Sequence, residues 1–233
     1  MNNTGLITAV GLGPGDAELI TLKGYKALQE ADIIFYPASS VTGNTLTSFS
    51  VQILNQLNLD VAIKALHIPM KAANSEEYYL QAYKLIKNEY DAGLNVVVVS
   101  EGDILFYSTF GYLWKYIQED GLNHRIIPGI PAFIAGGGQG NKPLVKGTES
   151  IHIIPCPDGL IHIKKELKDN RTLVVMKLSK IKNWDTFFGN LDRPFMYVER
   201  IGTANQFVTN KTEEMIGKRI PYFALLIIYN KED

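Results

Sequence analysis

The sequence predicts an α/β protein built from two α/β units, with a parallel sheet in the first unit and a mixed sheet in the second. In the first half, short apolar runs alternate with longer amphipathic segments. This alternation is typical of strands joined by right-handed helical crossovers, which give a parallel sheet. The clearest run, NVVVVS at Asn95–Ser100, is apolar as a central strand covered on both faces requires. The second half has four strand-like runs and one clear helix.

The elements of the first half are separated by stop signals. Glycines end the first apolar run, Pro37 ends the second, and Ser75 and Gly93 flank the longest helical pattern. The expected order is strand Leu6–Val10, helix Asp16–Ala31, strand Asp32–Tyr36, helix Thr45–Leu57, strand Ala62–Ile68, helix Ser75–Ala92, strand Asn95–Ser100, helix Tyr107–Glu119 and strand Arg125–Pro128.

The second half is expected to form a smaller unit. Its elements are strands Ser150–Pro155, Thr172–Leu178, Phe195–Ile201 and Tyr222–Tyr229 and the helix Lys180–Leu191. Turn residues at Gly121–His124 indicate the boundary, which gives domains of residues 1–122 and 123–233. Ligands of open α/β sheets bind beyond the carboxyl ends of the strands, so we expect a site in a cleft between the domains.

Composition limits the class of partner. The chain has 233 residues, of which 46% are hydrophobic and 20% charged, and its formal net charge is −1. Such a chain has no global field that draws nucleic acid or an anionic membrane, so local Lys and Arg must hold any anionic substrate. No stretch reaches about 18 apolar residues, and the N-terminus lacks a basic, signal-like segment. We expect a cytoplasmic protein with neither a membrane nor a nucleic-acid partner.

The first expected strand leads into the glycine loop Gly11–Gly15 (GLGPG). A dinucleotide-binding loop has the pattern G-x-G-x-x-G, and here the third glycine is misplaced. Asp16 and Glu18 follow at once, and their carboxylates would repel a pyrophosphate from the helix N-terminus. The loop therefore argues against a nicotinamide dinucleotide, and a purely structural turn is an equally good interpretation.

A second loop, Ser100–Ile104 (SEGDI), follows the strongest strand. A carboxylate such as that of Asp103 can pair with a cation or accept hydrogen bonds from hydroxyl and ammonium groups. S-adenosylmethionine is one ligand with all of these groups, because it carries a sulfonium, an ammonium and ribose hydroxyls. The alternative is that Asp103 merely caps the helix expected near Tyr107.

A third loop, Pro128–Ala132 (PGIPA), has two prolines that stiffen the backbone and a glycine that removes bulk. This combination suits a wall against a flat group such as adenine. The run Gly136–Gly138 lacks the Lys-Ser/Thr of a phosphate-binding P-loop, so we expect it to open space beside a helix or a ligand.

The pattern of cysteine and histidine predicts no metal site. Cys156 is the single cysteine, and we expect it to pack as a small hydrophobic residue. The histidines lack the i, i+4 spacing of a zinc-binding helix, and His152 is expected in the core. The four are His67, His124, His152 and His162.

Together these segments resemble the signatures of the tetrapyrrole (corrin/porphyrin) methylases. GLGPGDAELITLKG resembles the opening signature of that family and SEGDILFYST its second one. PGIPAF, VVMKL, YVERIG and IPYFALLII follow in the family's order, so the resemblance covers essentially the whole chain. Within the family, HIPM, FYSTFGYL, VMKL and IPYFALL are similar to the precorrin-2 C20-methyltransferases.

The resemblance implies a homodimeric enzyme that uses S-adenosylmethionine to methylate C20 of precorrin-2, or of its cobalt form, in cobalamin biosynthesis. The N-terminal domain would face the tetrapyrrole, and the C-terminal domain would complete the donor cleft. The implied donor contacts are Pro14, Gly102, Asp103, Ile104, Phe106, Pro131, Ala132, Met176, Ile201, Phe223 and Ala224.

The many carboxylates of such a substrate call for cations around the site. We expect substrate contacts within the stretch Lys64–Lys71 and elsewhere, although each charge is equally compatible with a solvated surface. The expected residues are Gly13, Gly15, His67, Lys71 and Arg200, with Lys142 and Lys146 as further candidates.

Two positions depart from the family pattern. Ile104 stands where a proline is usual, so that turn has a less rigid backbone. Gly136–Gly138 replace small alanine-like residues, which weakens the helix implied there by several tenths to about 1 kcal/mol per glycine.

The expected chemistry needs alignment more than acid catalysis, with the reacting atoms held roughly 3–3.5 Å apart. Tyr107, Glu101 and Glu199 are candidates for a base that removes the C20 proton, and water is an alternative. The competing functions are another methylase of the same fold, such as a precorrin C11 or C17 or uroporphyrinogen-III enzyme or diphthine synthase; a Rossmann-like NAD(P) oxidoreductase; and a binding module without activity.

Overall fold

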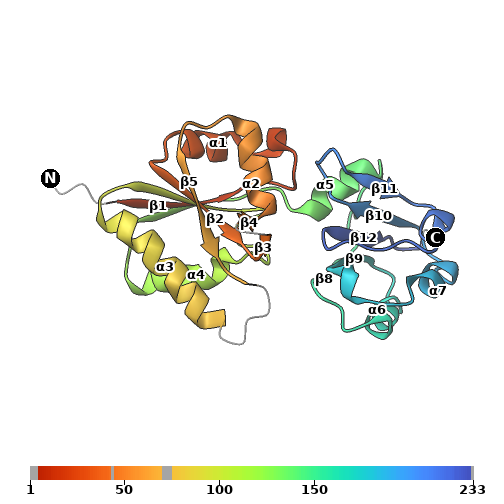
Figure 1. The fold of residues 1–233 in the computed structure, drawn as a ribbon. Helices are drawn as coiled ribbons and strands as arrows, with labels where there is room; N and C mark the ends of the chain where they lie inside the picture. Colours follow the sequence, from red (N-terminus) through yellow and green to blue (C-terminus); the bar gives the residue numbers. More distant parts are fainter. Residues whose placement is uncertain (1–4, 43–44, 70–74, 232–233) are drawn as a thin grey trace. The chain divides into compact units, whose positions relative to one another are not determined.

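The computed structural model describes residues 5–42, 45–69 and 75–231. The chain divides into two compact units, Met1–Pro131 and Ala132–Asp233. Each unit is a sheet flanked by helices, as Figure 1 shows. The expected boundary after residue 122 differs from this division, because the strand β7 (His124–Ile127) pairs with β1 (Leu6–Gly11) and so belongs to the first sheet.

The sheet of the first unit is parallel, as predicted. Among the described residues it has five strands in the order β5-β2-β6-β1-β7. Besides β1 and β7, its strands are β2 (Ile33–Ala38), β5 (Ala62–His67) and β6 (Asn95–Ser100). Val96 and Val98 of β6 pack into the core on one face, and Val97 and Val99 pack into the core on the other. Burial on both faces explains why this strand has no polar alternation.

Helices cover both faces of the first sheet (Figure 1). On one face lie α1 (Leu22–Gln29) and α2 (Phe49–Leu54), and on the other lie α3 (Ser75–Asp91) and α4 (Phe110–Glu119). The chain leaves β1 toward α1, whereas it leaves the neighbouring β6 toward α4. The carboxyl ends of β1 and β6 therefore form a topological switch point, where ligands of open α/β sheets bind.

Capping residues shorten the first expected helix. Residues Asp16–Ala31 form a 3-10 turn η1 (Ala17–Leu19) followed by α1, because side-chain caps start two separate elements. Asp16 Oδ1 accepts from the amide of Glu18 at 2.9 Å, and Thr21 Oγ1 accepts from that of Gly24 at 3.1 Å.

The second expected helix, Thr45–Leu57, is wrong in its first part. Residues Thr45–Thr47 form β4, which pairs antiparallel with β3 (Ser40–Thr42). Ser48 then caps α2, its Oγ accepting from the amide of Ser50 at 3.2 Å, and the 3-10 turn η2 (Asn55–Leu57) follows.

The second unit contains the predicted mixed sheet. In the part of the chain that the structure describes, its five strands have the order β11-β10-β12-β9-β8, and only the β8–β9 pair is parallel. The strands are β8 (Ile151–Ile154), β9 (Thr172–Met176), β10 (Phe195–Glu199), β11 (Phe207–Thr209) and β12 (Ala224–Ile228). The strand β11 was not expected from the sequence.

Helices also cover both faces of the second sheet. On one face lies α5 (Ala132–Gln139), and on the other lie α6 (Leu160–Glu166) and α7 (Trp184–Gly189). The helix expected at Lys180–Leu191 is shorter, because the 3-10 turn η3 (Leu178–Lys180) precedes it and Asn183 adopts a left-handed backbone before α7. A further 3-10 turn, η4, spans Thr212–Glu214.

The glycine run of α5 brings that helix close to its neighbours. A Cβ on Gly136 would meet side-chain atoms of Leu225 and Ile227 at 3.4 and 3.5 Å, and one on Gly137 would lie 2.8 Å from Leu144 Cγ. At Gly136 and Gly137 the run therefore permits close packing, and only Gly138 faces the open space that was expected.

Two single-residue predictions are wrong. Cys156 is exposed rather than packed, and Lys180 Nζ lies 3.5 Å from its sulfur. The His152 side chain is 36% exposed, and its Nδ1 lies 2.8 Å from Glu166 Oε2 on α6. Both residues sit at or just beyond β8, an edge strand that pairs only with β9 in the described part of the chain.

Candidate functional site: three strand-end loops

Two glycine loops meet at the carboxyl edge of the first sheet. The amide of Leu12 donates to Ser100 O at 2.9 Å. Gly13 and Gly102 exchange two backbone hydrogen bonds, of 3.1 and 2.7 Å, and form an isolated antiparallel bridge. The loops after β1 and β6 are therefore directly bonded, as a shared binding edge requires.

The carboxylate of Asp103 ties in the third loop. Its Oδ2 accepts from the amide of Gly129 at 2.9 Å, and its Oδ1 accepts from the amide of Leu105 at 2.9 Å. Because α4 begins at Phe110, Asp103 does not cap that helix. Each carboxylate oxygen keeps a further acceptor position for a ligand. We call the loops Gly11–Gly15, Gly102–Ile104 and Gly129–Pro131 together the loop junction.

The loop junction has no room for side chains at its centre. A Cβ on Gly129 would lie 2.2 Å from Gly102 O, and one on Gly11 would lie 2.6 Å from Gly129 N. Gly102 also has a φ of 68°, which favours glycine. The three loops therefore pack backbone against backbone at their centre, where only glycine fits.

Residues around the loop junction differ in what they expose. Pro14 is buried, and Pro131 and Phe106 are half-buried. Ile104 is fully buried in the core that α3 and α4 cover, so its side chain cannot line a site, and any contact expected of it must come from its backbone. Tyr107 is 54% exposed and holds a left-handed backbone, with a φ of 52°.

Two expected bases have defined partners. Glu101 Oε2 accepts from the hydroxyl of Ser50 at 2.7 Å, so α2 holds this carboxylate beside the loop junction. The Glu199 side chain is only 6% exposed, and its Oε1 accepts from the Tyr197 hydroxyl at 2.5 Å and lies 3.3 Å from Lys218 Nζ. Ser50 has no motif in the sequence; only the packing of α2 brings it to Glu101.

The expected substrate-side residues are only partly placed. His67 is exposed at the carboxyl end of β5, with its ring edge-on to Tyr78 at 5.7 Å. Lys64 pairs with Glu89 at 2.8 Å. Lys71 lies outside the described residues.

Several expected donor contacts gather at one edge of the second sheet. Met176 ends β9, Ile201 follows β10, and Ala224 begins β12, which runs antiparallel to both strands. Phe223 O accepts from the amide of Arg200 at 2.9 Å, and Arg200 holds a left-handed backbone with a φ of 46°. Ala132 begins α5.

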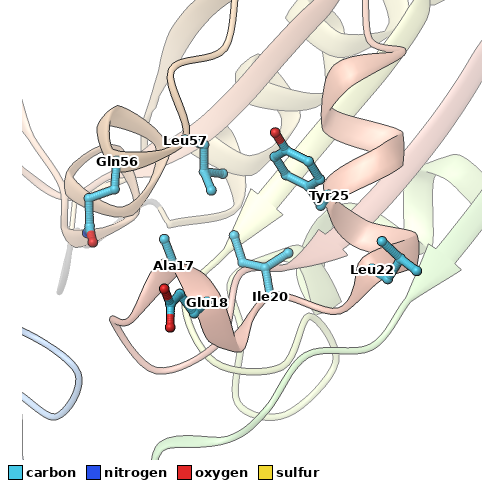
Figure 2. A pocket seen from close by; sticks show the side chains of 7 residues that line it. All are labelled: Ala17, Glu18, Ile20, Leu22, Tyr25, Gln56 and Leu57. Carbon is cyan, nitrogen blue, oxygen red and sulfur yellow. The ribbon is translucent and has the colours of Figure 1, made fainter.

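A separate hollow of about 410 Å³ lies among η1, α1 and η2 in the first unit (Figure 2). Ile20, Tyr25 and Leu57 surround it in Figure 2. Glu18 is the only charged residue among the described residues that line it. The hollow thus lacks the convergent polar groups of a catalytic site.

The family model described as Tetrapyrrole (Corrin/Porphyrin) Methylases matches residues 6–216. The Cobalamin biosynthesis protein CobIJ of Mycobacterium tuberculosis is 30% identical over 240 residues, which cover 98% of this chain and 46% of that protein. The chain thus spans about half the length of this relative. The Precorrin-2 C(20)-methyltransferase of a Sinorhizobium species is 29% identical over 243 residues, which cover 98% of this chain and 97% of that protein.

A solved structure has the same fold. It is a Uroporphyrin-III C-methyl transferase from Thermus thermophilus complexed with S-adenyl homocysteine, with a TM-score of 0.65 and 20% sequence identity over 96% of each chain. Within the described residues, no helix is both long and apolar enough to cross a membrane.

Proposed function

Because the chain belongs to the tetrapyrrole methylase family, we propose that it transfers a methyl group from S-adenosylmethionine to C20 of precorrin-2 in cobalamin biosynthesis. The observation that carries this proposal is the loop junction, in which the backbones of three strand-end loops pack together and the Asp103 carboxylate is fixed among them. This edge lies at the switch point of a parallel sheet, where a ligand is expected.

The loop junction fits a positively charged donor better than a dinucleotide. The Asp16 carboxylate already accepts a hydrogen bond from the amide of Glu18 at the start of η1. It therefore occupies the position that a pyrophosphate would need. Asp103 adds a second negative charge that can accept from ammonium or hydroxyl groups. Both carboxylates oppose a diphosphate, and Asp103 favours the sulfonium compound.

We propose that residues of both units hold the donor. In the first unit these are Pro14, Gly102, Asp103 and Pro131, together with the backbone of Ile104 and the ring of Phe106. In the second unit they are Ala132, Met176, Ile201, Phe223 and Ala224. When bound, S-adenosylmethionine supplies a methyl group whose leaving group is a neutral thioether, so the protein need not provide an acid. Its residues orient the reacting atoms and exclude water.

For the proton that leaves C20, we propose Glu101 or Tyr107 as the acceptor. Glu101 is fixed by Ser50 beside the loop junction, and Tyr107 is exposed on the same loop. Glu199 is a poorer candidate, because its carboxylate is nearly buried and already engaged by Tyr197 and Lys218. We further propose a cytoplasmic homodimer, in which Gly13, Gly15, His67, Lys71 and Arg200 contact the substrate.

Mass spectrometry of the product tests the function. The protein is incubated with isotope-labelled S-adenosylmethionine and either precorrin-2 or its cobalt form, and NMR locates the new methyl group. One added methyl at C20 is expected, and the preferred acceptor identifies the metal state of the substrate. A methyl at C11 or C17, labelling of elongation factor 2 alone, or calorimetric binding of NAD(H) without S-adenosylhomocysteine would each overturn the proposal.

A further inference from the structure

A groove of about 900 Å³ lies in the second unit, close to the carboxyl end of β10 and the start of β12. Apolar and aromatic side chains line part of it, and charged side chains line the rest. We call it the basic groove after its four cations, Lys182, Arg200, Lys218 and Arg219.

The buried acid on the groove wall is neutralised locally. Glu199 accepts from the Tyr197 hydroxyl at 2.5 Å and lies 3.3 Å from Lys218 Nζ. Burial and the bond to Glu199 raise the pKa of Tyr197, so the phenol keeps the proton that it donates. Lys218 also lies over the Phe207 ring, 3.9 Å from its centroid. Lys218 is thus paired with a buried acid and adds no net positive charge to the groove.

The remaining cations exceed the remaining acid. Lys182 and Arg219 are exposed, and neither makes an ion pair among the described residues. Arg200 has its nearest described acid, Glu199, at 4.0 Å. The other lining carboxylate, Asp185, already accepts from the amide of Gly217 at 2.9 Å. The chain as a whole has a net charge of −1, so this positive field is local to the groove.

The lining also contains a donor without an acceptor. Trp184 is 6% exposed, and its buried indole N–H has no hydrogen-bond partner among the described residues. Because this nitrogen has almost no exposed surface, it adds no binding group to the groove, and the indole serves here as a reporter beside the groove. The excess of cations is therefore the feature of the groove that points to an anionic ligand.

We propose that the basic groove binds the carboxylate groups of an acidic small molecule. Arginine forks bind carboxylates through two parallel hydrogen bonds, and lysine adds a point charge. Apolar neighbours such as Ile220 and Pro221 can pack on the hydrocarbon part of such a ligand. The inference rests on the proposed function for its natural occupant, because the tetrapyrrole substrate carries many carboxylates.

Fluorescence of Trp184 provides the test. The chain has two tryptophans, so Trp114→Phe leaves Trp184 as the single reporter. This protein is titrated with uroporphyrin, a porphyrin rich in carboxylates, and separately with inorganic phosphate. The test variant adds Lys182→Glu and Arg219→Glu. The matched control adds Lys164→Glu, an exposed lysine on α6 of the same unit that does not line the groove.

Saturable quenching by uroporphyrin is expected, with a Kd that rises at least about tenfold in the test variant and stays within about twofold in the control. Equal Kd values in the two variants would overturn the proposal, as would displacement of uroporphyrin by phosphate at a similar concentration. If the double variant unfolds more easily in urea, Lys182→Gln and Arg219→Gln are tested singly.

Failure of this proposal is distinguishable from failure of the proposed function. Uroporphyrin binding needs no methyl transfer, and binding of S-adenosylhomocysteine is measured by calorimetry on the same proteins. Unchanged uroporphyrin binding in the test variant, with normal S-adenosylhomocysteine affinity, would overturn the proposal of a carboxylate-binding groove and leave the proposed methyltransferase function standing. Absence of S-adenosylhomocysteine binding in the wild type would overturn the proposed methyltransferase function and leave the groove proposal standing.

Discussion

At the scale of single residues, Gly129 controls whether the loop junction can close. In Gly129→Ala the new Cβ would lie 2.2 Å from Gly102 O, which is backbone and cannot turn aside. We expect a loss of about 1–3 kcal/mol in the free energy of unfolding, as for other overpacked sites, together with weaker S-adenosylhomocysteine binding. Urea denaturation and calorimetry measure the two effects.

The matched control is Gly111→Ala on α4, where a Cβ meets nothing within 4 Å. Alanine there should stabilise the helix by about 0.5–1 kcal/mol. A Gly129→Ala protein as stable as this control, with unchanged ligand affinity, would show that the three loops tolerate separation.

The carboxylate of Asp103 is the second residue with a testable role. Asp103→Asn removes the charge and one of two acceptor oxygens that hold Leu105 and Gly129. A hydrogen bond to a charged group is worth about 1.5–3 kcal/mol, so S-adenosylhomocysteine affinity should fall by at least tenfold. Asp60→Asn, an exposed acid of the same unit, is the control. Calorimetry that found both variants equal to wild type would remove Asp103 from the site.

In the second unit, Arg193 is a residue whose testable role is structural: its buried guanidinium holds several backbone carbonyl groups together. The residue is 5% exposed, and its guanidinium donates to the carbonyl oxygens of Leu167, Asp169, Arg171 and Tyr229. Arg193→Ala leaves these acceptors without a donor, so the unit should lose at least about 1–3 kcal/mol of stability. Urea unfolding followed by Trp184 fluorescence checks this, with exposed Lys168→Ala as the control. A loss no larger than that of the control would show that water replaces the guanidinium.

At the scale of elements, the central strand β6 could be predicted from the sequence because burial on both faces leaves it almost entirely apolar. Helix ends were less predictable. The apolar spacing of residues 16–31 continues across Thr21, yet the hydroxyl of Thr21 starts a new helix there. The β3–β4 pair replaces helix in the next segment, because Thr45–Thr47 pairs with the strand just before it, and pairing overrides weak local propensity.

The candidate site could likewise be predicted from the sequence only in part. Glycine and aspartate at strand ends indicated two loops of the site, and both lie in the loop junction. The burial of Ile104 and the bond between Ser50 and Glu101 depend on how α2, α3 and α4 pack. Such contacts join residues far apart in the chain, so no local pattern carries them.

The glycines of α5 give a prediction for a whole element. Gly138 has open space at its Cβ, so Gly138→Ala should stabilise the second unit by about 0.5–1 kcal/mol. Gly137→Ala should gain less or lose stability, because its Cβ would lie 2.8 Å from Leu144 Cγ and that side chain must move. Thermal unfolding of the two variants compares them directly. Equal gains would mean that Leu144 relaxes without cost.

At the scale of the whole molecule, each unit has its own hydrophobic cores and its own tryptophan. Trp114 on α4 reports the first unit, and Trp184 on α7 reports the second. The variants Trp184→Phe and Trp114→Phe therefore follow the unfolding of each unit separately. The proposed donor contacts lie in both units, so binding of one donor molecule is expected to change the unfolding reported by each tryptophan.

We expect S-adenosylhomocysteine to raise the unfolding midpoint seen by both tryptophans. A ligand that binds only the folded state stabilises it by about 2.7 kcal/mol at 100 times its Kd, and a ligand held by both units is lost when either one unfolds. Urea titrations with and without the ligand measure the two shifts, with NAD(H) as the control ligand. A shift of the Trp114 transition alone would confine the donor to the loop junction and exclude Met176, Ile201 and Ala224 from its binding.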